Sequence, residues 1–415
     1  MASQGDEQAR AAAESAARRS YGKLVAFLAA RTRDVAGAED ALSEAFAAAL
    51  VEWPEKGAPE SAEAWLLAVA RHKFIDASRR RLSGEKATPQ LTIMVEELQA
   101  AARADDIPDE RLALMFACAH PAIEPSIRAP LILQTVLGFD AAAIASAFLV
   151  APATMGQRLV RAKSKIKQAV IPFRTPERSE LAERSAAVLD SIYAAFAEGW
   201  SDPMGAEARR RNLSEEAIWL GGLVASLLPG EPEALGLLAL MLYSEARRAA
   251  RRDANGDYVP LADQDPASWD GSLIQQAEAL LSRAGAMGVI GRYQLEAAVQ
   301  SAHVLRRLGG RPDWAAIERL YDGLLALTGS PVVAINRAIA LSETKGPQAA
   351  LEALDKLAGD PQLTNYQPYW AARAGLLACA GAHEAADAAY QRAIGLEADP
   401  AVRRFLQRRR AELRS

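Results

Sequence analysis

The stretch from Leu131 to Lys167 constrains the fold of this chain most, because it predicts two short helices joined by a tight turn. Asp140 suits the N-cap of the first helix, and Pro152 suits the first turn of the second, where its missing N–H has no intrahelical partner. The buried side of the first helix is expected to hold Ile144, Phe148 and Leu149. Four apolar residues recur at helical spacing in the second helix and are expected to face inward: Met155, Leu159, Ala162 and Ile166.

A different face of the second helix carries side chains that suit duplex DNA. In the major groove Arg can bond bidentately to guanine and Gln to adenine, while Lys and Thr hold phosphates. The sequence has no acidic residue between positions 141 and 176, which suits a polyanionic partner. The candidate DNA-contacting residues are Thr154, Gln157, Arg158, Arg161 and Lys165. The alternative interpretation is a basic, solvated helical hairpin, because such patterns are common in helical proteins.

The composition predicts a nearly all-helical chain. Strong helix formers dominate, aromatic residues make up only 6%, and alternating Val/Ile/Thr runs are almost absent. A length of 415 residues fits two or three domains. No stretch approaches the roughly 20 apolar residues of a membrane span, and the N-terminus has no apolar core typical of a secretion signal. Cys118 and Cys379 lie far apart, so we expect a cytoplasmic protein without disulfides and without a membrane partner.

The net charge of −4 conceals a difference between the two parts of the chain. Residues 1–174 hold 22 basic and 21 acidic side chains, and residues 175–415 hold 26 and 31. Because the second part is the more acidic, any contact with nucleic acid is expected in the first part.

Upstream, residues 21–81 predict amphipathic helices with a polar loop at 55–61. The apolar stripes of the earlier helices are Leu24, Phe27 and Leu28, then Leu42, Ala45, Phe46 and Leu50. Asp40 and Glu44 are four residues apart, so their carboxylates share a helix face beside the second stripe. A later helix opens at Trp65 and interleaves basic with aromatic side chains, as binding to an unstacked single strand requires. A packed helix with a solvated basic end is the alternative.

These motifs, in this order, resemble a known family. AEDALSEAF, AWLLAVARHKFIDASRRR, a polar linker and a helix–turn–helix are similar to sigma-70-type RNA polymerase sigma factors, specifically the extracytoplasmic-function kind, over residues 21 to 170. The resemblance implies binding to core RNA polymerase, through the clamp helices of the β′ subunit and the flap of the β subunit. It also implies binding to promoter DNA, both duplex and melted.

The resemblance assigns roles to residues at the matching positions. The clamp-helix contact would be made by Asp40, Glu44 and Phe46. The loop 55–61 would capture a flipped base of the minus-ten element. The minus-ten surface would comprise Trp65, His72, Lys73, Asp76, Arg79 and Arg80. The recognition helix for the minus-thirty-five element would use Thr154, Gln157, Arg158 and Arg161, with Lys165 on the same face.

The region after residue 171 resembles the subgroup of these sigma factors that has a long, tetratricopeptide-like helical extension. The phrases that carry this resemblance are LVRAKSKIKQAVIPF, ARRDANGDYVPLADQDPASWD and SPVVAINRAIAL. Residues 330–361 and 367–400 also share a pattern of Pro, apolar helix, Gly turn, Ala-rich helix and Asp-Pro, which is typical of a helical-hairpin repeat. Such repeats bind proteins, so a regulatory protein partner of this region is expected.

The predicted fold is therefore all-α, with two small helical sigma domains, the second ending in a helix–turn–helix, and a helical-repeat C-terminal domain. The expected boundaries are a mobile tail at 1–20, a region 2 domain at 21–82, a linker at 83–107, a region 4 domain at 108–172, a linker at 173–185 and a tetratricopeptide-like extension at 186–415.

The sequence lacks the signatures of several other classes of function. The four histidines and two cysteines lack metal-ligand spacing, and no phosphate-binding Gly-rich loop or nucleophile elbow is present, so we expect no enzyme, no cofactor and no metal. The acidic segment 253–265 has its Gly256 too early for a calcium loop and is expected to be a structural connector. A stand-alone helix–turn–helix regulator and a helical-repeat scaffold stay as alternatives.

Overall fold

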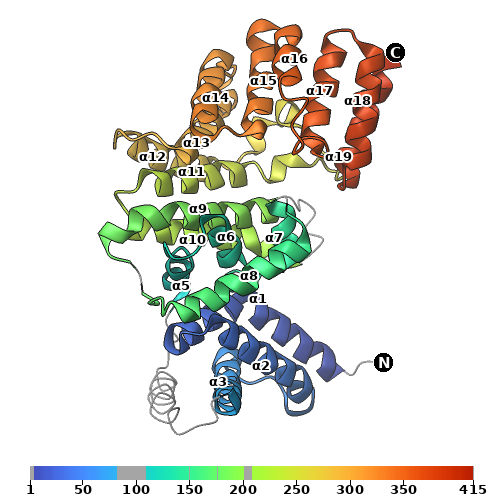
Figure 1. Cartoon of the computed structure of the whole chain (residues 1–415). Helices are drawn as coiled ribbons and strands as arrows, with labels where there is room; N and C mark the ends of the chain where they lie inside the picture. The colour runs from blue at the N-terminus through green and yellow to red at the C-terminus, as the bar shows by residue number, and fades with distance from the viewer. Residues whose placement is uncertain (1–3, 82–108, 149, 175, 201–207, 415) are drawn as a thin grey trace. The chain divides into compact units, whose positions relative to one another are not determined.

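A computed structural model of the 415-residue chain describes residues 4–81, 109–148, 150–174, 176–200 and 208–414. Over these residues the regular elements are α-helices and short 3-10 helices, with one isolated bridge between Arg252 and Tyr258 and no strand (Figure 1). The predicted all-α fold is confirmed. The chain divides into two compact units, residues 1–199 with 208–214 and residues 200–207 with 215–415.

The first unit is built from helices of both predicted DNA-binding parts and from most of α9, which was predicted as linker and extension. They are α1 (Gln4–Thr32), α2 (Val35–Lys56), α3 (Ala62–Arg81), α5 (Arg111–Cys118), α6 (Pro125–Thr135), α7 (Ala141–Ala147), α8 (Pro152–Gln168) and α9 (Arg178–Trp200) up to Gly199. The linker predicted at 83–107 lies outside the described residues. Two described segments that we expected to be a mobile tail and a linker are helical. Residues 4–20 belong to α1, and residues 178–185 belong to α9.

Packing explains why α1 extends upstream of Tyr21. Ala13 and Ala16 are buried, and the hydroxyl of Ser20 donates a hydrogen bond to the carboxylate of Glu63 in α3. Small alanines on one side of a helix are enough to cover a neighbouring helix closely.

The predicted apolar stripes of α1 and α2 form the centre of this unit, except for Phe46, which is half-buried, and Leu50. Leu24, Phe27, Leu28, Leu42 and Ala45 are at most 1% exposed. Leu50 was expected to be buried with them, but its exposed fraction is 50%, so this prediction is wrong. The stripe leaves the core near the C-terminal end of α2, where Trp53 takes the buried position instead.

The predicted helix–turn–helix is present as α7 and α8. Oδ1 of Asp140 accepts hydrogen bonds from the backbone N–H groups of Ala142 and Ala143, both at 2.8 Å, which confirms it as the cap of α7. Pro152 occupies the first turn of α8. All four residues predicted to face inward from α8 are buried, as is Ile144 in α7; Phe148 is half-buried, and Leu149 lies outside the described residues.

The N-terminal helices and the helix–turn–helix share one core in this unit. α1 packs against α5 and α6, and α2 packs against α8. The approach is close at Gly22 in α1, where an added Cβ atom would lie 1.9 Å from the carbonyl oxygen of Val136, directly after α6. Only a residue without a side chain fits there.

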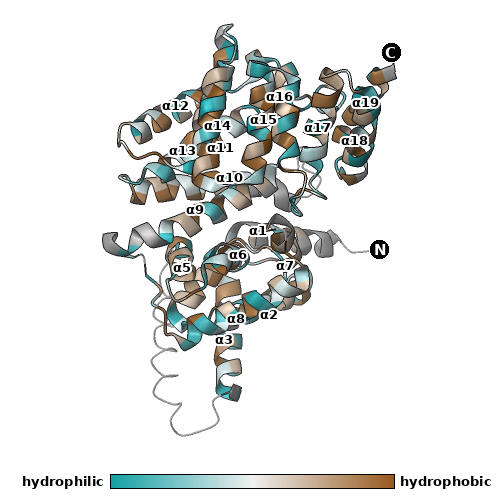
Figure 2. Cartoon of the chain, turned by 45° about the horizontal axis from the view of Figure 1, so that its top comes forward, coloured by the Kyte–Doolittle hydropathy of each residue, from teal (hydrophilic) through white to brown (hydrophobic). Residues whose placement is uncertain are grey.

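The second unit is a series of antiparallel helices. The α-helices are α10 (Ala208–Leu227), which crosses the division at Ser214, α11 (Pro232–Ala246), α12 (Gly271–Gly285), α13 (Arg292–Val304), α14 (Trp314–Thr328), α15 (Pro331–Lys345), α16 (Pro347–Asp355), α17 (Gln367–Cys379), α18 (His383–Leu396) and α19 (Pro400–Ala411). The 3-10 helices are η1 (Ala249–Arg251), η2 (Leu261–Asp263), η3 (Pro266–Ser268), η4 (Leu305–Leu308) and η5 (Glu412–Arg414). Along these helices apolar and polar residues alternate between sides (Figure 2).

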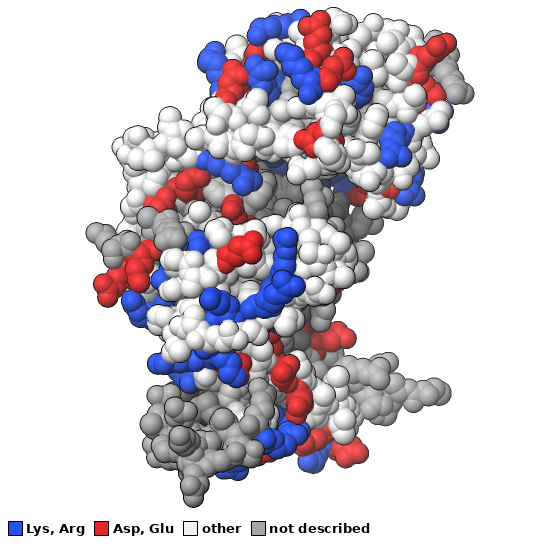
Figure 3. Space-filling model, viewed as in Figure 1, with Lys and Arg blue, Asp and Glu red and all other residues white. Residues whose placement is uncertain are grey.

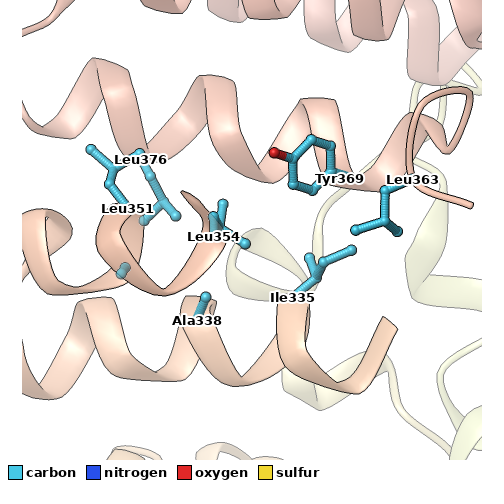
Figure 4. Close-up of a cluster of buried hydrophobic side chains, with 8 residues drawn as sticks. Ile335, Ala338, Leu351, Leu354, Leu363, Tyr369 and Leu376 are labelled. Atoms are coloured by element: carbon cyan, nitrogen blue, oxygen red, sulfur yellow. The ribbon is translucent and has the colours of Figure 1, made fainter. Parts of the chain in front are cut away.

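The two predicted repeats each form a helical hairpin. Residues 330–361 contain α15 and α16, and residues 367–400 contain α17 and α18. Gly346 and Gly381 lie at the turns with φ of 87° and 76°, a backbone region that favours glycine. The hairpins join through a shared apolar cluster (Figure 4), whose labelled members are Ile335, Ala338, Leu351, Leu354, Leu363, Tyr369 and Leu376.

The acidic segment at 253–265 is a structural connector, as expected. Oδ1 of Asp253 accepts hydrogen bonds from the backbone of Asn255 and Asp257, which closes a turn at Gly256. The carboxylate of Asp257 accepts hydrogen bonds from Arg404 and Arg408 of α19 at 2.8–3.0 Å. These contacts tie the connector to the last helix of the same unit.

Among the helices of the described residues, none combines the length and the apolarity that crossing a bilayer requires.

Two glycines in helix interiors predict opposite effects of the same substitution. Gly22→Ala should lower the free energy of unfolding of the first unit by at least about 1 kcal/mol, because the new methyl group overlaps the Val136 carbonyl. Gly156→Ala in α8 is the matched control and should raise that free energy by up to about 1 kcal/mol, because nothing lies within 4 Å of the added Cβ and alanine favours helix. Chemical denaturation followed by circular dichroism measures both. Equal effects of the two substitutions would contradict the close packing of α1 on α6.

Candidate nucleic-acid and polymerase interface

The exposed side of α8 carries every residue predicted to contact the upstream promoter element. Thr154, Gln157, Arg158, Arg161 and Lys165 are all exposed. Nη2 of Arg161 lies 3.4 Å from Oε1 of Gln157, so these two side chains are neighbours one turn apart. In the space-filling view, Lys and Arg side chains gather over this helix (Figure 3). Because the opposite side of α8 is buried, the helix presents a cationic, hydrogen-bonding surface on a rigid support.

Three further residues on α8 are not among the predicted DNA-contacting residues, although the sequence places Lys163 and Lys167 in the basic run from Arg158 to Arg174. Val160 is exposed on α8, with an exposed fraction of 63%, but it lies on a side of the helix away from Arg158 and Lys165. Lys163 and Lys167 face α2 instead. Nζ of Lys163 lies 2.7 Å from Oε2 of Glu39, and Nζ of Lys167 lies 2.6 Å from Oδ2 of Asp34. The sequence signal for the lysines was the basic run, but their partners lie 124 and 133 residues away.

The residues predicted to contact the polymerase lie on two sides of α2. Asp40 and Glu44 share the exposed side, where Glu44 forms an ion pair with Lys73 of α3 at 3.4 Å. Phe46 is half-buried and packs against the ring of Tyr21, with 6.3 Å between ring centroids. Burial, together with Glu39 and Asp40, raises the pKa of that tyrosine. Val51 is also exposed on α2, and it adds an apolar group to the acidic face.

The residues predicted to contact the minus-ten element lie along α3. Three of them, His72, Asp76 and Arg79, are exposed and repeat at helical spacing, so they share one side of the helix. Trp65 is half-buried and packs edge-to-face on Trp53, with 5.4 Å between ring centroids. The two remaining residues contact other groups of the protein. Arg80 is exposed and donates a hydrogen bond to the backbone carbonyl of Asp76, and Lys73 is turned toward Glu44.

The predicted base-capturing loop is shorter than expected, because α2 continues to Lys56. Gly57 ends the helix with φ of 83°, and its N–H donates to the carbonyl of Trp53. Ser61 accepts a hydrogen bond from the backbone N–H of Ala64 at the start of α3. The loop is thus held at both ends while Gly57, Ala58 and Glu60 stay exposed.

The neighbouring Cys118 and His120 are not arranged for nucleophilic chemistry. Cys118 is fully buried and its sulfur lies 3.6 Å from the hydroxyl of Thr135; burial raises the pKa of the thiol to about 12. Nδ1 of His120 accepts a hydrogen bond from the backbone N–H of Ala122. Within the described residues, no group of His, Cys, Asp and Glu side chains is placed to hold a metal ion.

Comparison with known families identifies the N-terminal helices. A family model for sigma-70 region 2 matches residues 17–83, which contain the predicted polymerase-contacting and minus-ten residues. The N-terminal part of the chain belongs to the sigma-70 family, as its region 2. Members of this family are transcription factors that bind RNA polymerase and recognise promoters, and the match supports this role for the N-terminal part of the chain.

A second model, described as a family of unknown function (DUF6596), matches residues 184–285, from α9 to the end of α12. An uncharacterized protein of Rhizobium meliloti (strain 1021), R00370, is 40% identical over 365 residues, which covers 86% of each chain. The similarity therefore extends far beyond region 2 into both units. No solved structure matches this sigma factor.

Proposed function

We propose that this protein is an alternative sigma factor of the extracytoplasmic-function kind, with α1 to α3 as region 2 and α5 to α8 as region 4. The observation that carries the proposal is the pairing of a region 2 match with a helix–turn–helix whose second helix exposes Gln157, Arg158 and Arg161. In this proposal Asp40, Glu44 and Phe46 contact the β′ clamp helices, α3 and the loop 55–61 bind the melted minus-ten element, and α8 reads the minus-thirty-five element. A contact between region 4 and the β flap completes docking on the polymerase.

The physical basis differs between the two DNA contacts. α8 is a rigid helix with guanidinium and amide groups, and these groups form the bidentate base contacts available in the major groove. α3 offers the exposed ring of His72 and the half-buried ring of Trp65 together with exposed cations, which suits unstacked bases and a flexible backbone. In this proposal α8 reads duplex DNA, and α3 with the loop binds a single strand. Opening a promoter requires both activities.

Polymerase docking is tested on α2. Replacing Asp40 and Phe46 together with alanine should weaken binding to core RNA polymerase by roughly 10- to 100-fold, because a charged and an apolar contact are both removed. Glu52→Ala is the matched control, since Glu52 lies on the same helix and pairs with Lys56 one turn away, at 2.8 Å. Affinity is measured with labelled protein and purified core enzyme. Unchanged affinity of the double variant would refute the docking assignment. A thermal unfolding curve separates lost docking from the lost packing of Phe46 on Tyr21.

Promoter reading is tested on α8. Arg158→Ala should cost about 1–3 kcal/mol at the preferred promoter and relax base preference at one position, because a bidentate Arg–guanine contact is lost. Lys165→Ala should weaken all sequences alike, because a phosphate contact carries no sequence information. Transcription from a library of promoter sequences with holoenzyme gives both readouts. If Arg158→Ala alters neither output nor base preference, the register of the recognition helix is wrong.

We further propose that the helical-repeat region, which we interpret as tetratricopeptide-like, is a regulatory domain that activity requires and that binds a protein partner. Helical-hairpin repeats bury one continuous apolar cluster and leave long surfaces for protein contacts. The acidic excess of residues 175–415 supports a competing role, autoinhibition of the basic helices. Screening within about 8 Å at cellular salt weakens this electrostatic argument, so we favour the required role.

The two roles predict opposite results of truncation. The cut belongs after Gly199 rather than after Arg174, because α9 packs in the first unit, with Val188 and Ile192 buried and the hydroxyl of Ser191 3.4 Å from the carbonyl oxygen of Ala129. Truncation after Gly199 should lower promoter-specific transcription several-fold while the fragment stays helical and soluble. A soluble fragment with more activity than the intact protein would instead establish autoinhibition.

A further inference from the structure

Four arginines gather at the C-terminal end of α11 in the second unit. They are Arg247, Arg248, Arg251 and Arg252. The segment that follows them contains the connector 253–265 (yellow in Figure 1) and returns to the same place. The backbone N–H of Val259 donates to the carbonyl of Arg251, and the N–H of Asp270 donates to the carbonyl of Ala246, both at 2.9 Å. The arginines therefore lie at the point where this segment begins and ends.

Carboxylates neutralise only part of this positive charge. Arg248 pairs with Glu245 at 2.7 Å, and Arg252 pairs with Asp399. Among the described residues, the other two arginines form no ion pair with a carboxylate. A buried charge is costly unless an opposite charge and hydrogen bonds compensate it, so the end of α11 favours a further anion.

Arg247 and Arg251 also keep N–H donors that the protein does not use. A guanidinium group has five such donors. Arg251 donates from Nη1 to the carbonyl of Trp200 at 2.7 Å, and the ring of that tryptophan lies 4.3 Å from its Cζ. Arg247 donates to the carbonyl of Tyr243 and to the side chain of Gln300. Burial, together with Arg251, lowers the pKa of Arg247 to about 10, so both groups are charged at pH 7.

The hydroxyl of Tyr258 lies among the same charges. Its ring packs edge-to-face on Phe405, with 5.5 Å between ring centroids, so the phenol is held in place. Burial raises the pKa of this tyrosine although three guanidinium groups oppose the shift, those of Arg251, Arg252 and Arg247. The hydroxyl is therefore protonated near pH 7 and is able to donate a hydrogen bond to an anion.

Two further groups complete the electrostatics. Nε of Arg252 is buried and has no hydrogen-bond partner among the described residues, although its side chain is only 10% exposed. An unpaired buried donor costs free energy that an acceptor would recover. Glu397 also acts on Tyr258, but less than each of the three guanidinium groups, and its carboxylate accepts the N–H of Asp399 at 2.8 Å.

We propose that Arg247, Arg251 and Tyr258 form a binding site for a phosphate group in the second unit, with Arg252 as a neighbouring donor. Guanidinium groups bind phosphate oxygens bidentately. A phosphate monoester carries about −1.5 to −2 charges at pH 7, which suits two arginines without carboxylate partners better than a singly charged carboxylate does. All three residues are half-buried, so the site suits a small phosphate rather than a polymer. The site supplies the helical-repeat region with a ligand of its own, independent of promoter binding.

The test is calorimetric titration of the intact chain with inorganic phosphate, in chloride buffer of constant ionic strength. A parallel titration with glycerol phosphate distinguishes two sources of the same group. Tighter binding of glycerol phosphate identifies an organic phosphate as the ligand, and equal or weaker binding identifies the free ion. Phosphate at about 100 times its dissociation constant should also raise the thermal unfolding midpoint of the second unit by roughly 5–10 °C. Absence of binding by both probes, with an unchanged midpoint, would overturn the proposal.

Two variants and one control locate the site. Tyr258→Phe removes only the hydroxyl and keeps the ring contact with Phe405, so it should fold normally and weaken phosphate binding roughly 10-fold. Arg251→Gln should weaken binding at least about 10-fold and remove the dependence of the midpoint on phosphate. Arg410→Gln removes the same charge elsewhere in the unit, where the partner is Asp387 at 2.7 Å, and should change the affinity by at most about twofold.

The phosphate dependence separates a binding role from a purely structural one. A structural role of Arg251 predicts that its substitution lowers the midpoint equally with and without phosphate. The proposed site predicts that most of the loss is seen only with phosphate present. Equal phosphate affinity in Tyr258→Phe, Arg251→Gln and the Arg410→Gln control would overturn the proposal.

Discussion

The backbone of α1 approaches α6 so closely at Gly22 that a Cβ atom there would lie 1.9 Å from the carbonyl oxygen of Val136. This contact places α1 against both α5 and α6, and α2, which packs on α1, consequently lies against α8. The helices that match sigma-70 region 2 and the helix–turn–helix therefore form one core rather than two separate ones. The charges that meet across the contact, Glu39 with Lys163 and Asp34 with Lys167, follow from this packing.

This arrangement imposes a conflict on a protein of the proposed function. Promoter elements some 25 base pairs apart are separated by about 85 Å of duplex, at 3.4 Å per base pair along each strand. Helices that contact each other directly cannot reach both elements at once. Core polymerase would resolve the conflict by holding α2 on one surface and α8 on another. The energy that holds α2 on α8 in the free chain then opposes binding to DNA without polymerase.

The sequence predicts features that depend on residues close together in the chain, but not contacts between residues far apart in it. The buried stripe of α8, the cap at Asp140 and the glycine turns at Gly346 and Gly381 follow from local periodicity and turn chemistry, and all are confirmed. The prediction that Leu50 is buried is wrong, because helical spacing alone does not show where a neighbouring helix ends. The partners of Lys163 and Lys167 are set by tertiary packing over more than a hundred residues, so the basic run indicated an anion but not which one. The roles of individual promoter-contacting residues stay predictions, because their exposure permits contact with DNA without demonstrating it.

The measurement that tests the central claim most directly is promoter binding and melting by the intact chain with and without core RNA polymerase. A promoter selected by the holoenzyme is labelled, and specific binding and reactivity of unpaired thymines are followed in both conditions. We predict a specific complex with a melted minus-ten region only when core polymerase is present, and at most weak, sequence-independent binding by the free chain. Equally tight, sequence-specific binding of the same duplex without polymerase would contradict the account and identify a stand-alone helix–turn–helix regulator.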